Sequence, residues 1–303
     1  MESRSFYFLN GEIFPVDRCT ISPFDRGLLY GDGLFETMRV YRGIPFLWEE
    51  HLRRLREGAD FLEIPLPMSE EEVGRALARV LRVNQVKDGV VRMSLTRGPG
   101  PRGLVPPDRP EPTFLITATR GIPYDNGLYQ RGYRAVVVSL RRNRYSPLPF
   151  YKTLNNLEGM IAAREARRSG ADEGLFTNSD GYLCEGTLSN LFLVRKGVLL
   201  TPPKESGLLA GITRSQVIQL AREEGLPVEE TPLELDDLLS AGEAFLTSSV
   251  LEIMPLVSVN GRLIGTGKPS PLTKRLTCLY RATVLNYMEK EVSRLLGLSE
   301  SNL

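Results

Sequence analysis

The feature that most restricts the fold lies in the middle of the chain. There, a predicted strand is followed by a proline-rich loop and then by a predicted helix. Residues 134–140 contain the run Ala-Val-Val-Val-Ser, which predicts a buried strand. Residues 145–150 read Tyr-Ser-Pro-Leu-Pro-Phe, a loop pinned by its prolines. From Leu154 on, apolar side chains recur at helical spacing, and Ser169-Gly170 is typical of the end of such a helix.

One lysine, Lys152, lies between this loop and the helix. Its neighbours Phe150, Tyr151 and Leu154 offer apolar surroundings, which disfavour a charged ammonium and lower the pKa of a lysine. A desolvated lysine is what Schiff-base chemistry requires. On position alone, a surface lysine at a helix start is the favoured alternative, so the rest of the chain has to decide.

Length and charge indicate an ordinary globular protein. Because 303 residues exceed the size at which a single core usually stops growing, we expect two domains. Lys and Arg number 38, Asp and Glu number 37, and the net charge is +1, so no bulk field attracts nucleic acid or an acidic membrane. No apolar run approaches the length of a membrane span, and the N-terminus lacks the pattern of a signal peptide.

Cysteine and histidine usage argues against a metal centre. Cys19, Cys184 and Cys278 are widely spaced and odd in number, which fits a reducing cytoplasm better than a disulfide framework or a zinc site. His51 is the single histidine, so a multi-histidine metal site is excluded. We therefore expect a cytoplasmic protein without a metal.

The elements predict a small α+β domain at residues 1–118, a linker at 119–130 and a larger domain at 131–303. In the first half, the pattern predicts a hairpin at 6–16, strands at 34–41, 89–96 and 112–118, and helices at 48–62 and 70–84. In the second half, further strands are predicted at 174–177, 182–184 and 243–250, a hairpin at 257–264, and helices at 208–225 and 270–296.

Two groups of polar residues in the first half are candidate site residues. Strand alternation places Phe35, Thr37 and Arg39 on one face, either as the wall of a site or as the solvated face of an edge strand. His51 and Arg54 lie one helical turn apart, a spacing that is most often a solvated edge.

Arginines also flank the turn at 97–103, which reads Arg-Gly-Pro-Gly-Pro-Arg-Gly. Arg97 and Arg102 could hold a carboxylate through bidentate contacts, or the turn could be a plain basic hairpin tip. In the second half, Glu185 is followed by glycine and small polar residues beside an apolar strand. That setting is unusual for a surface glutamate, although a turn acid remains the alternative.

Two segments of the second half are suited to a phosphate group. Gly211, Ile212 and Thr213 begin a predicted helix and offer backbone N–H groups, a glycine for close approach and a hydroxyl. Ser248 and Ser249 belong to three consecutive hydroxyl residues at the end of a strand. Many helices begin in this way with nothing bound, so neither segment is specific alone.

Taken together, these features match the requirements of pyridoxal 5′-phosphate. A desolvated lysine, an acid to partner the ring nitrogen and two seats for an anion all fall in the second half. The residues alone leave a generic two-domain enzyme as an equal alternative.

Six motifs make the interpretation specific. In chain order they are Tyr-Gly-Asp-Gly-Leu-Phe-Glu-Thr at 30–37, His-Leu-Arg-Arg-Leu at 51–55, Lys-Thr-Leu-Asn-Asn-Leu at 152–157, Glu-Gly-Thr-Leu-Ser-Asn at 185–190, Gly-Ile-Thr-Arg at 211–214 and Ser-Ser-Val-Leu-Glu-Ile-Met-Pro at 248–255. Through them the whole chain resembles the fold-type IV (class IV) pyridoxal-phosphate enzymes, which include branched-chain aminotransferases, D-amino acid aminotransferases and 4-amino-4-deoxychorismate lyases.

The resemblance implies an α/β fold of two domains, with the cofactor between them and the site completed across a homodimer. It implies that Lys152 forms the Schiff base and moves the proton, and that Glu185 pairs with the ring nitrogen. The cofactor-binding set it implies, with the two candidate phosphate seats, is Arg54, Lys152, Glu185, Gly211, Ile212, Thr213, Ser248 and Ser249.

Within the family, the resemblance is greatest to the lyases, which act on a small amino substrate. In those lyases, the threonine that matches Thr37 is placed to handle a proton at the leaving enolpyruvyl group. Arg39, Arg97 and Arg102 would suit the carboxylates of the substrate. Tyr30 has a counterpart in branched-chain aminotransferases. An aminotransferase for branched-chain L-amino acids or D-amino acids, with 2-oxoglutarate or pyruvate, is therefore the alternative. A binding protein without activity is disfavoured by the intact lysine and acid.

Overall fold

The computed structural model describes residues 5–18 and 20–295, so Cys19 and the expected helix end at Leu296 lie outside the described residues. The chain divides into two compact units. The first comprises Met1–Ile122, Tyr151–Asn155 and Leu285–Leu303, and the second comprises Pro123–Phe150 and Asn156–Val284. The domain boundaries expected from the sequence stay a prediction. The two units differ from them in that Tyr151–Asn155 and the chain from Leu285 belong to the first unit.

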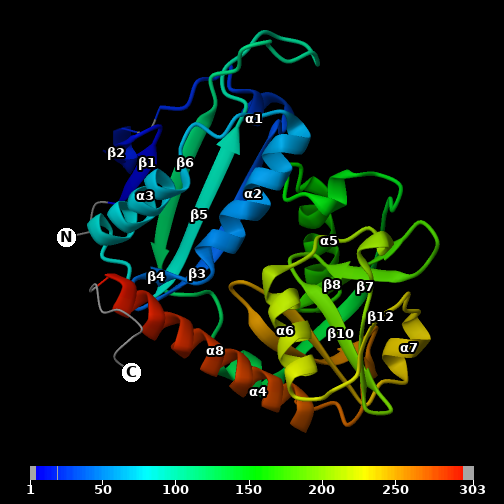
Figure 1. Cartoon of the computed structure of the whole chain (residues 1–303). Coiled ribbons are helices and arrows are strands. Elements are labelled where there is room, and N and C mark those ends of the chain that lie inside the picture. The colour runs from blue at the N-terminus through cyan, green and yellow to red at the C-terminus, as the bar shows by residue number, and fades with distance from the viewer. Residues whose placement is uncertain (1–4, 19, 296–303) are drawn as a thin grey trace. The chain divides into compact units, whose positions relative to one another are not determined.

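The first unit is built on one antiparallel sheet of six strands (Figure 1). In sheet order, the strands are β2 (Glu12–Pro15), β1 (Phe6–Leu9), β6 (Thr113–Arg120), β5 (Gly89–Thr96), β3 (Gly33–Tyr41) and β4 (Ile44–Pro45). The helices are η1 (Val16–Arg18), α1 (Arg26–Tyr30), α2 (Trp48–Leu62) and α3 (Glu70–Val83). The predicted helix at 48–62 is confirmed residue for residue.

One face of this sheet carries the core of the unit. Leu34, Met38 and Val40 of β3 pack in one cluster with apolar side chains of α2 and α3, because alternate strand residues point to the same face. α3 begins with a capping box, in which Ser69 and Glu72 satisfy each other's backbone N–H groups. Phe35, Thr37 and Arg39 of β3 therefore face away from both helices.

The second unit is built on a mixed sheet of nine strands (Figure 1). The strands, in sheet order, are β12 (Val228–Glu230), β11 (Val198–Thr201), β10 (Asn190–Arg195), β13 (Glu243–Ser248), β14 (Glu252–Val259), β7 (Tyr133–Arg142), β8 (Glu173–Asn178) and β9 (Leu183–Gly186), and β15 (Arg262–Leu263) pairs with β14. Because Asn190 of β10 also pairs with Glu185 of β9, the strands from β10 to β9 close into a ring.

Helices complete the second unit, and two of them begin later than the sequence predicted. They are α4 (Asn126–Arg131), η2 (Leu148–Phe150), α5 (Leu157–Arg168), η3 (Lys204–Ser206), α6 (Ile212–Glu223), α7 (Leu235–Leu239) and the first part of α8 (Pro271–Leu295). Leu154 does not start α5 because its N–H donates to Gly33 O at 2.9 Å. Leu208 does not start α6 because the backbone of the next residue, Leu209, is bound by side chains. Its N–H donates to Glu185, and its carbonyl oxygen accepts from Asn190.

Candidate functional site

Lys152 lies in the first unit, where its segment runs beside the start of β3. The Phe35 N–H donates to Lys152 O at 2.9 Å, and Thr153 forms a bridge with Leu34. The Lys152 Nζ atom lies 4.5 Å from the centre of the Phe35 ring. Backbone pairing to a sheet, rather than a helix start, therefore fixes the lysine. No observation tests the lowered pKa expected from its apolar neighbours, so that stays a prediction.

The Phe35 ring is shared by a second cation that sequence reasoning missed. The Arg92 guanidinium lies 3.7 Å from the centre of this ring, and burial lowers the pKa of Arg92. Arg92 is the cross-strand partner of Thr37. Alternation along β5 could have singled out Arg92, because Val91 and Met93 on either side of it are buried. Lys152, Phe35, Thr37 and Arg92 thus belong to one face of the sheet.

Glu36 points to the opposite, core face and pairs there with two residues of α2. Its carboxylate lies 2.6 Å from His51 Nδ1 and accepts from Arg54 Nε at 2.7 Å and from Arg54 Nη2 at 2.8 Å. Burial would raise the pKa of Glu36, but Arg54 and His51 outweigh burial and lower it to about 2. Burial lowers the pKa of His51 despite this carboxylate. The spacing of 51 and 54 thus builds a buried ion-pair network, not a solvated edge.

The contacts of Arg39 and Arg97 give both residues a structural role. Arg39 is buried, and its guanidinium donates to Val40 O and Gly89 O at 2.9 Å each. Arg97 pairs with Asp32 at 2.8 Å and donates to two carbonyl groups at the end of α2. These contacts occupy both terminal nitrogens of Arg39 and all three guanidinium nitrogens of Arg97, whereas the buried Arg39 Nε has no hydrogen-bond partner among the described residues. Their predicted substrate role stays a prediction that the contacts do not support.

The turn at 97–103 is held by residues of α1. The Arg26 guanidinium donates to Gly103 O at 2.9 Å and to Leu104 O at 3.2 Å. The Gly103 N–H donates to the Tyr30 hydroxyl at 2.9 Å, and Arg102 itself is exposed. Tyr30 and Arg102 are thereby brought to the same turn, with Arg26 as the anchor that the sequence did not reveal.

In the second unit, Glu185 lies where β9 and β10 close the ring of strands. Its carboxylate pairs with Arg142 Nη2 at 3.2 Å and accepts from the Leu209 N–H at 3.1 Å. Asn190, the cross-strand neighbour of Glu185, donates from Nδ2 to Leu209 O at 2.8 Å. Glu185 is 8% exposed, so the predicted ring-nitrogen partner is a buried and fixed carboxylate rather than a loose turn acid.

The start of α6 follows directly after Leu209. Gly211 is its N-cap, and no side chain of the described residues caps the helix, so no protein oxygen among them competes for the positive end of the dipole. A Cβ atom at Gly211 would lie 2.1 Å from Asn190 Oδ1, which explains the glycine. Thr213 in the first turn is buried and Ile212 is half-buried. Both the cap and the helix dipole fit a phosphate group.

The end of β13 lies beside Asn190, the first residue of β10. Thr247 is the cross-strand partner of Asn190, and Ser248 and Ser249 follow it. The Ser248 hydroxyl accepts from the Leu251 N–H at 3.3 Å. The Thr247 hydroxyl is buried and has no hydrogen-bond partner within residues 5–18 and 20–295, an exception that marks a polar atom available to a bound group. The predicted residues of this unit are thus gathered around Asn190.

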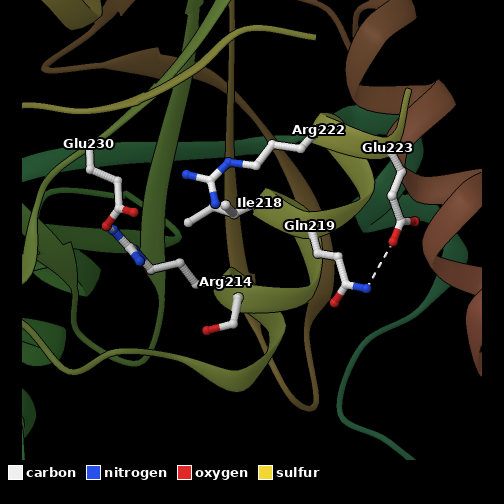
Figure 2. Close-up of a pocket in the computed structure, with 7 residues that line it drawn as sticks. Arg214, Ile218, Gln219, Arg222, Glu223 and Glu230 are labelled. Atoms are coloured by element: carbon white, nitrogen blue, oxygen red, sulfur yellow. Dashed lines mark hydrogen bonds and ion pairs between the residues drawn. The ribbon is translucent and has the colours of Figure 1, made fainter. Parts of the chain in front are cut away.

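A depression of about 370 Å³ lies beside α6 (Figure 2). It is lined by Arg214, Ser215, Ile218, Gln219, Arg222, Glu223 and Glu230, and none of these is a predicted site residue. Arg214 donates from Nη2 to Glu230 at 2.7 Å, and Gln219 donates to Glu223 at 2.8 Å (Figure 2). Because Arg214 and Glu230 pair with each other and no predicted site residue lines the depression, we assign it no role.

Membrane-spanning helices and metal-binding clusters are both absent from the part of the chain that the structure describes. No helix in residues 5–18 and 20–295 is long and apolar enough to cross a membrane. Within the same ranges, no group of histidine, cysteine and acidic side chains could hold a metal ion.

The sequence of the chain matches a known protein family and several of its members. Residues 33–259 match the model of the amino-transferase class IV family. The chain is 41% identical over 270 residues to a Methanocaldococcus jannaschii protein provisionally named a branched-chain-amino-acid aminotransferase, covering 89% of this chain and 93% of the relative. It is 34% identical to the aminodeoxychorismate lyase of Bacillus subtilis, covering 95% and 97%.

A solved structure agrees with these sequence matches. The branched-chain amino acid aminotransferase from T.th., solved with pyridoxamine 5′-phosphate, superimposes with a TM-score of 0.88 at 29% identity. The alignment covers 94% of this chain and 95% of that one.

Proposed function

Because the chain belongs to the class IV aminotransferase family, whose cofactor is pyridoxal 5′-phosphate, we propose that it splits 4-amino-4-deoxychorismate into 4-aminobenzoate and pyruvate. Family membership confirms the resemblance read from the six motifs, and with it the α/β, fold-type IV class. The lyase activity itself is the proposal. It rests on Thr37, which lies on the same sheet face as the Phe35 ring that contacts the Lys152 amine.

Each unit contributes residues that would hold the cofactor. In the first unit these are the Lys152 amine and Arg54, whose guanidinium Glu36 fixes with two hydrogen bonds. In the second unit they are Glu185 for the ring nitrogen, and Gly211, Ile212, Thr213, Ser248 and Ser249 for the phosphate. Bound pyridoxal phosphate supplies an electron sink for a carbanion at the carbon that carries the amino group.

Two side chains would move the protons of the lyase reaction. The Lys152 amine removes the proton from the ring carbon that bears the amino group. The Thr37 hydroxyl delivers a proton to the methylene carbon of the leaving enolpyruvyl group, which becomes pyruvate. The C–O bond to that group breaks, and the ring becomes the aromatic ring of 4-aminobenzoate. Arg92, half-buried opposite Thr37, is a cation suited to a substrate carboxylate.

The remaining predicted substrate residues keep different proposed roles. Tyr30 and Arg102 remain proposed substrate contacts, since both belong to the turn that Arg26 anchors. Arg39 and Arg97 are proposed to act on substrate only through the fold, because backbone carbonyls and acidic side chains already bind the terminal nitrogens of both guanidinium groups.

An aminotransferase is the second candidate, and the relatives favour it. The 41% identical relative carries the name of a branched-chain aminotransferase, and the solved structure is of that class. In this case branched-chain L-amino acids or D-amino acids would be the donors, with 2-oxoglutarate or pyruvate as the acceptor.

Two assays separate the candidates. Purified holoenzyme is mixed with 4-amino-4-deoxychorismate, and 4-aminobenzoate is measured by fluorescence and pyruvate by a coupled assay. Separately, it is mixed with single amino acids, and the absorbance change from the pyridoxal to the pyridoxamine form is followed. Equimolar products with a poor half-reaction support the lyase. No pyruvate together with a rapid half-reaction would overturn it and establish the aminotransferase.

Variants test the assigned residues. Thr37→Val should lower the lyase kcat roughly 100-fold, while Thr37→Ser, which keeps the hydroxyl, should stay within about tenfold of the wild type. Lys152→Ala should lower turnover by at least about 1000-fold while phosphate contacts still bind the cofactor. Substantial residual activity of Lys152→Ala would contradict the mechanism for either candidate.

We further propose a cytoplasmic homodimer. Leu28, Leu104 and Val105 in the first unit are 70%, 85% and 81% exposed, a set of large apolar side chains that a second copy could cover. Sedimentation equilibrium should give twice the chain mass of 33.9 kDa, and a monomer at micromolar concentration would contradict the proposal.

A further inference from the structure

Glu173, the first residue of β8, is a buried carboxylate that binds the turn between Glu185 and Asn190. Its Oε1 atom accepts from the Thr187 N–H and the Gly174 N–H, each at 3.0 Å, and from the Thr187 hydroxyl. Its Oε2 atom accepts from the Ser189 hydroxyl at 3.0 Å. Both oxygens are thus used, and three of the four bonds go to the turn.

The surroundings of Glu173 differ from those of an ordinary buried acid. It is 6% exposed, and its hydrogen-bond partners among the described residues are uncharged. Burial raises the pKa of Glu173, and the bonds from Thr187, Ser189 and Gly174 only partly offset this. Burying a carboxyl without a cation costs free energy, so a gain elsewhere must offset that cost.

The turn is packed tightly against this carboxyl. The Gly186 N–H donates to Ser189 O at 2.6 Å, which closes the turn. A Cβ atom at Gly186 would lie 2.2 Å from Ser189 Oγ and 3.1 Å from Glu173 Cδ. The glycine, the two hydroxyl residues and the glutamate therefore form one unit that has little freedom to shift.

The ends of the turn are the two residues that organise the site in this unit. Glu185 accepts from the Leu209 N–H, and Asn190 donates to Leu209 O and excludes a side chain at Gly211. A shift of the turn therefore moves both the ring-nitrogen partner and the start of α6. Misplacement by about 1 Å can cost roughly 100-fold in rate.

We propose that Glu173 is a positioning residue, which holds the 186–189 turn so that Glu185 meets the ring nitrogen of the cofactor. This inference rests on the proposed role of Glu185. Under this proposal, Glu173 touches neither cofactor nor substrate. It affects cofactor binding only by fixing the position of the turn.

Two substitutions at Glu173 test whether hydrogen bonding to the turn is what matters. Glu173→Ala removes all four bonds, and we expect the cofactor dissociation constant to rise about tenfold and the visible absorption band of the bound cofactor to change. Glu173→Gln keeps one oxygen for the backbone N–H groups, and its amide can donate to the Ser189 hydroxyl. We expect this variant to restore both readouts to within about twofold of the wild type.

A matched control separates positioning from general loss of stability. Glu243 in the same unit also accepts two backbone N–H groups and a hydroxyl, at the start of α8. Glu243→Ala should lower the melting temperature and leave the dissociation constant and absorption band unchanged. An equal change of both readouts in Glu243→Ala and Glu173→Ala would overturn the inference.

A double-mutant cycle with Glu185→Gln tests the route of the effect. If Glu173 acts through Glu185, Glu173→Ala should change the absorption band in wild type and add little in the Glu185→Gln background. A full additive change there would overturn the inference. An unaltered band in Glu185→Gln alone would instead overturn the proposed role of Glu185, and the inference with it. Should Glu173→Ala not fold, Ser189→Ala removes a single bond, and an unchanged dissociation constant in it would count against positioning.

Discussion

The two units hold their proposed site residues by different physical means. In the first unit, buried Glu36 is paired with Arg54 and His51, and these partners lower its pKa to about 2. In the second unit, the described partners of buried Glu173 are all uncharged donors, and burial raises its pKa. The same residue type at similar burial thus behaves oppositely, because the charge of the partners decides which form is stable.

The comparison shows how each unit responds to change. A network of charges is sensitive to pH and to the loss of one partner, since the remaining charge stays in a low-dielectric site. Contacts among glycines, hydroxyls and backbone groups depend on shape instead. The predictions below test this division, first where charge dominates and then where shape does.

The largest effect is expected at Glu36. Glu36→Ala leaves the guanidinium of Arg54 without its two bonds to a fully buried carboxylate, and breaking such a pair costs about 3–5 kcal/mol. Urea unfolding at pH 7 measures the loss, and cofactor affinity should fall as well because Arg54 is no longer fixed. Arg75→Ala, which breaks an exposed pair with Glu71 on α3, is the control and should change stability little.

Acid should remove the same stabilisation reversibly. The pKa of Glu36 lies below its ordinary value of 4.5, so its contribution is present above pH 4.5 and is lost as the pH falls toward about 2. The difference between 4.5 and about 2 corresponds to about 3 kcal/mol. His51, whose pKa burial also lowers, acts in the same direction below pH 6.5.

Glu173 should act with the opposite sign. Its pKa is raised, so its contribution is present at low pH and is lost as the pH rises through the folded-state pKa. Unfolding free energies between pH 3 and pH 7 for wild type, Glu36→Gln and Glu173→Gln test both statements. Equal slopes in the two variants would contradict the comparison.

Local patterns singled out Glu185, Gly211 and the hydroxyls after Thr247, because each stands in a short motif of glycine and small polar residues. The fold brings these motifs together around Asn190, which pairs with Glu185 and Thr247 and contacts the position of Gly211, while their roles toward the cofactor stay predictions. The family resemblance then supplied the fold class and the cofactor.

Residues whose partners come from distant elements could not be predicted in the same way. The backbone of Lys152 pairs with β3, so the sequence signal of a helix start was overridden by a tertiary contact. Arg97 looked free for substrate until the fold brought it to Asp32 and to the end of α2. Glu173 gave only the weak signal of an acid at the start of an apolar strand.

A change of shape without charge should have a smaller effect in the second unit. In Gly211→Ala the new Cβ atom would lie 2.1 Å from Asn190 Oδ1, and Asn190 can move only by giving up its bond to Leu209 O. Overpacking of this kind costs about 1–3 kcal/mol, and cofactor affinity should fall about tenfold. Gly242→Ala is the matched control, because its new Cβ atom would meet no described neighbour closer than 3.8 Å. Gly225→Ala is not suitable, because the φ of 72° at Gly225 would strain an alanine.

The smallest effect is expected at two buried threonines of the same sheet, which differ in their partners. The Thr201 hydroxyl donates to Leu191 O at 2.8 Å, whereas the Thr247 hydroxyl has no hydrogen-bond partner among the described residues. Thr201→Val should therefore destabilise the cofactor-free protein by about 1 kcal/mol, and Thr247→Val should stabilise it by a similar amount. If cofactor binding satisfies the Thr247 hydroxyl, this gain should vanish in the holoenzyme. Thermal unfolding of both variants with and without cofactor measures the difference, and equal destabilisation in all four cases would show that Thr247 already has a partner.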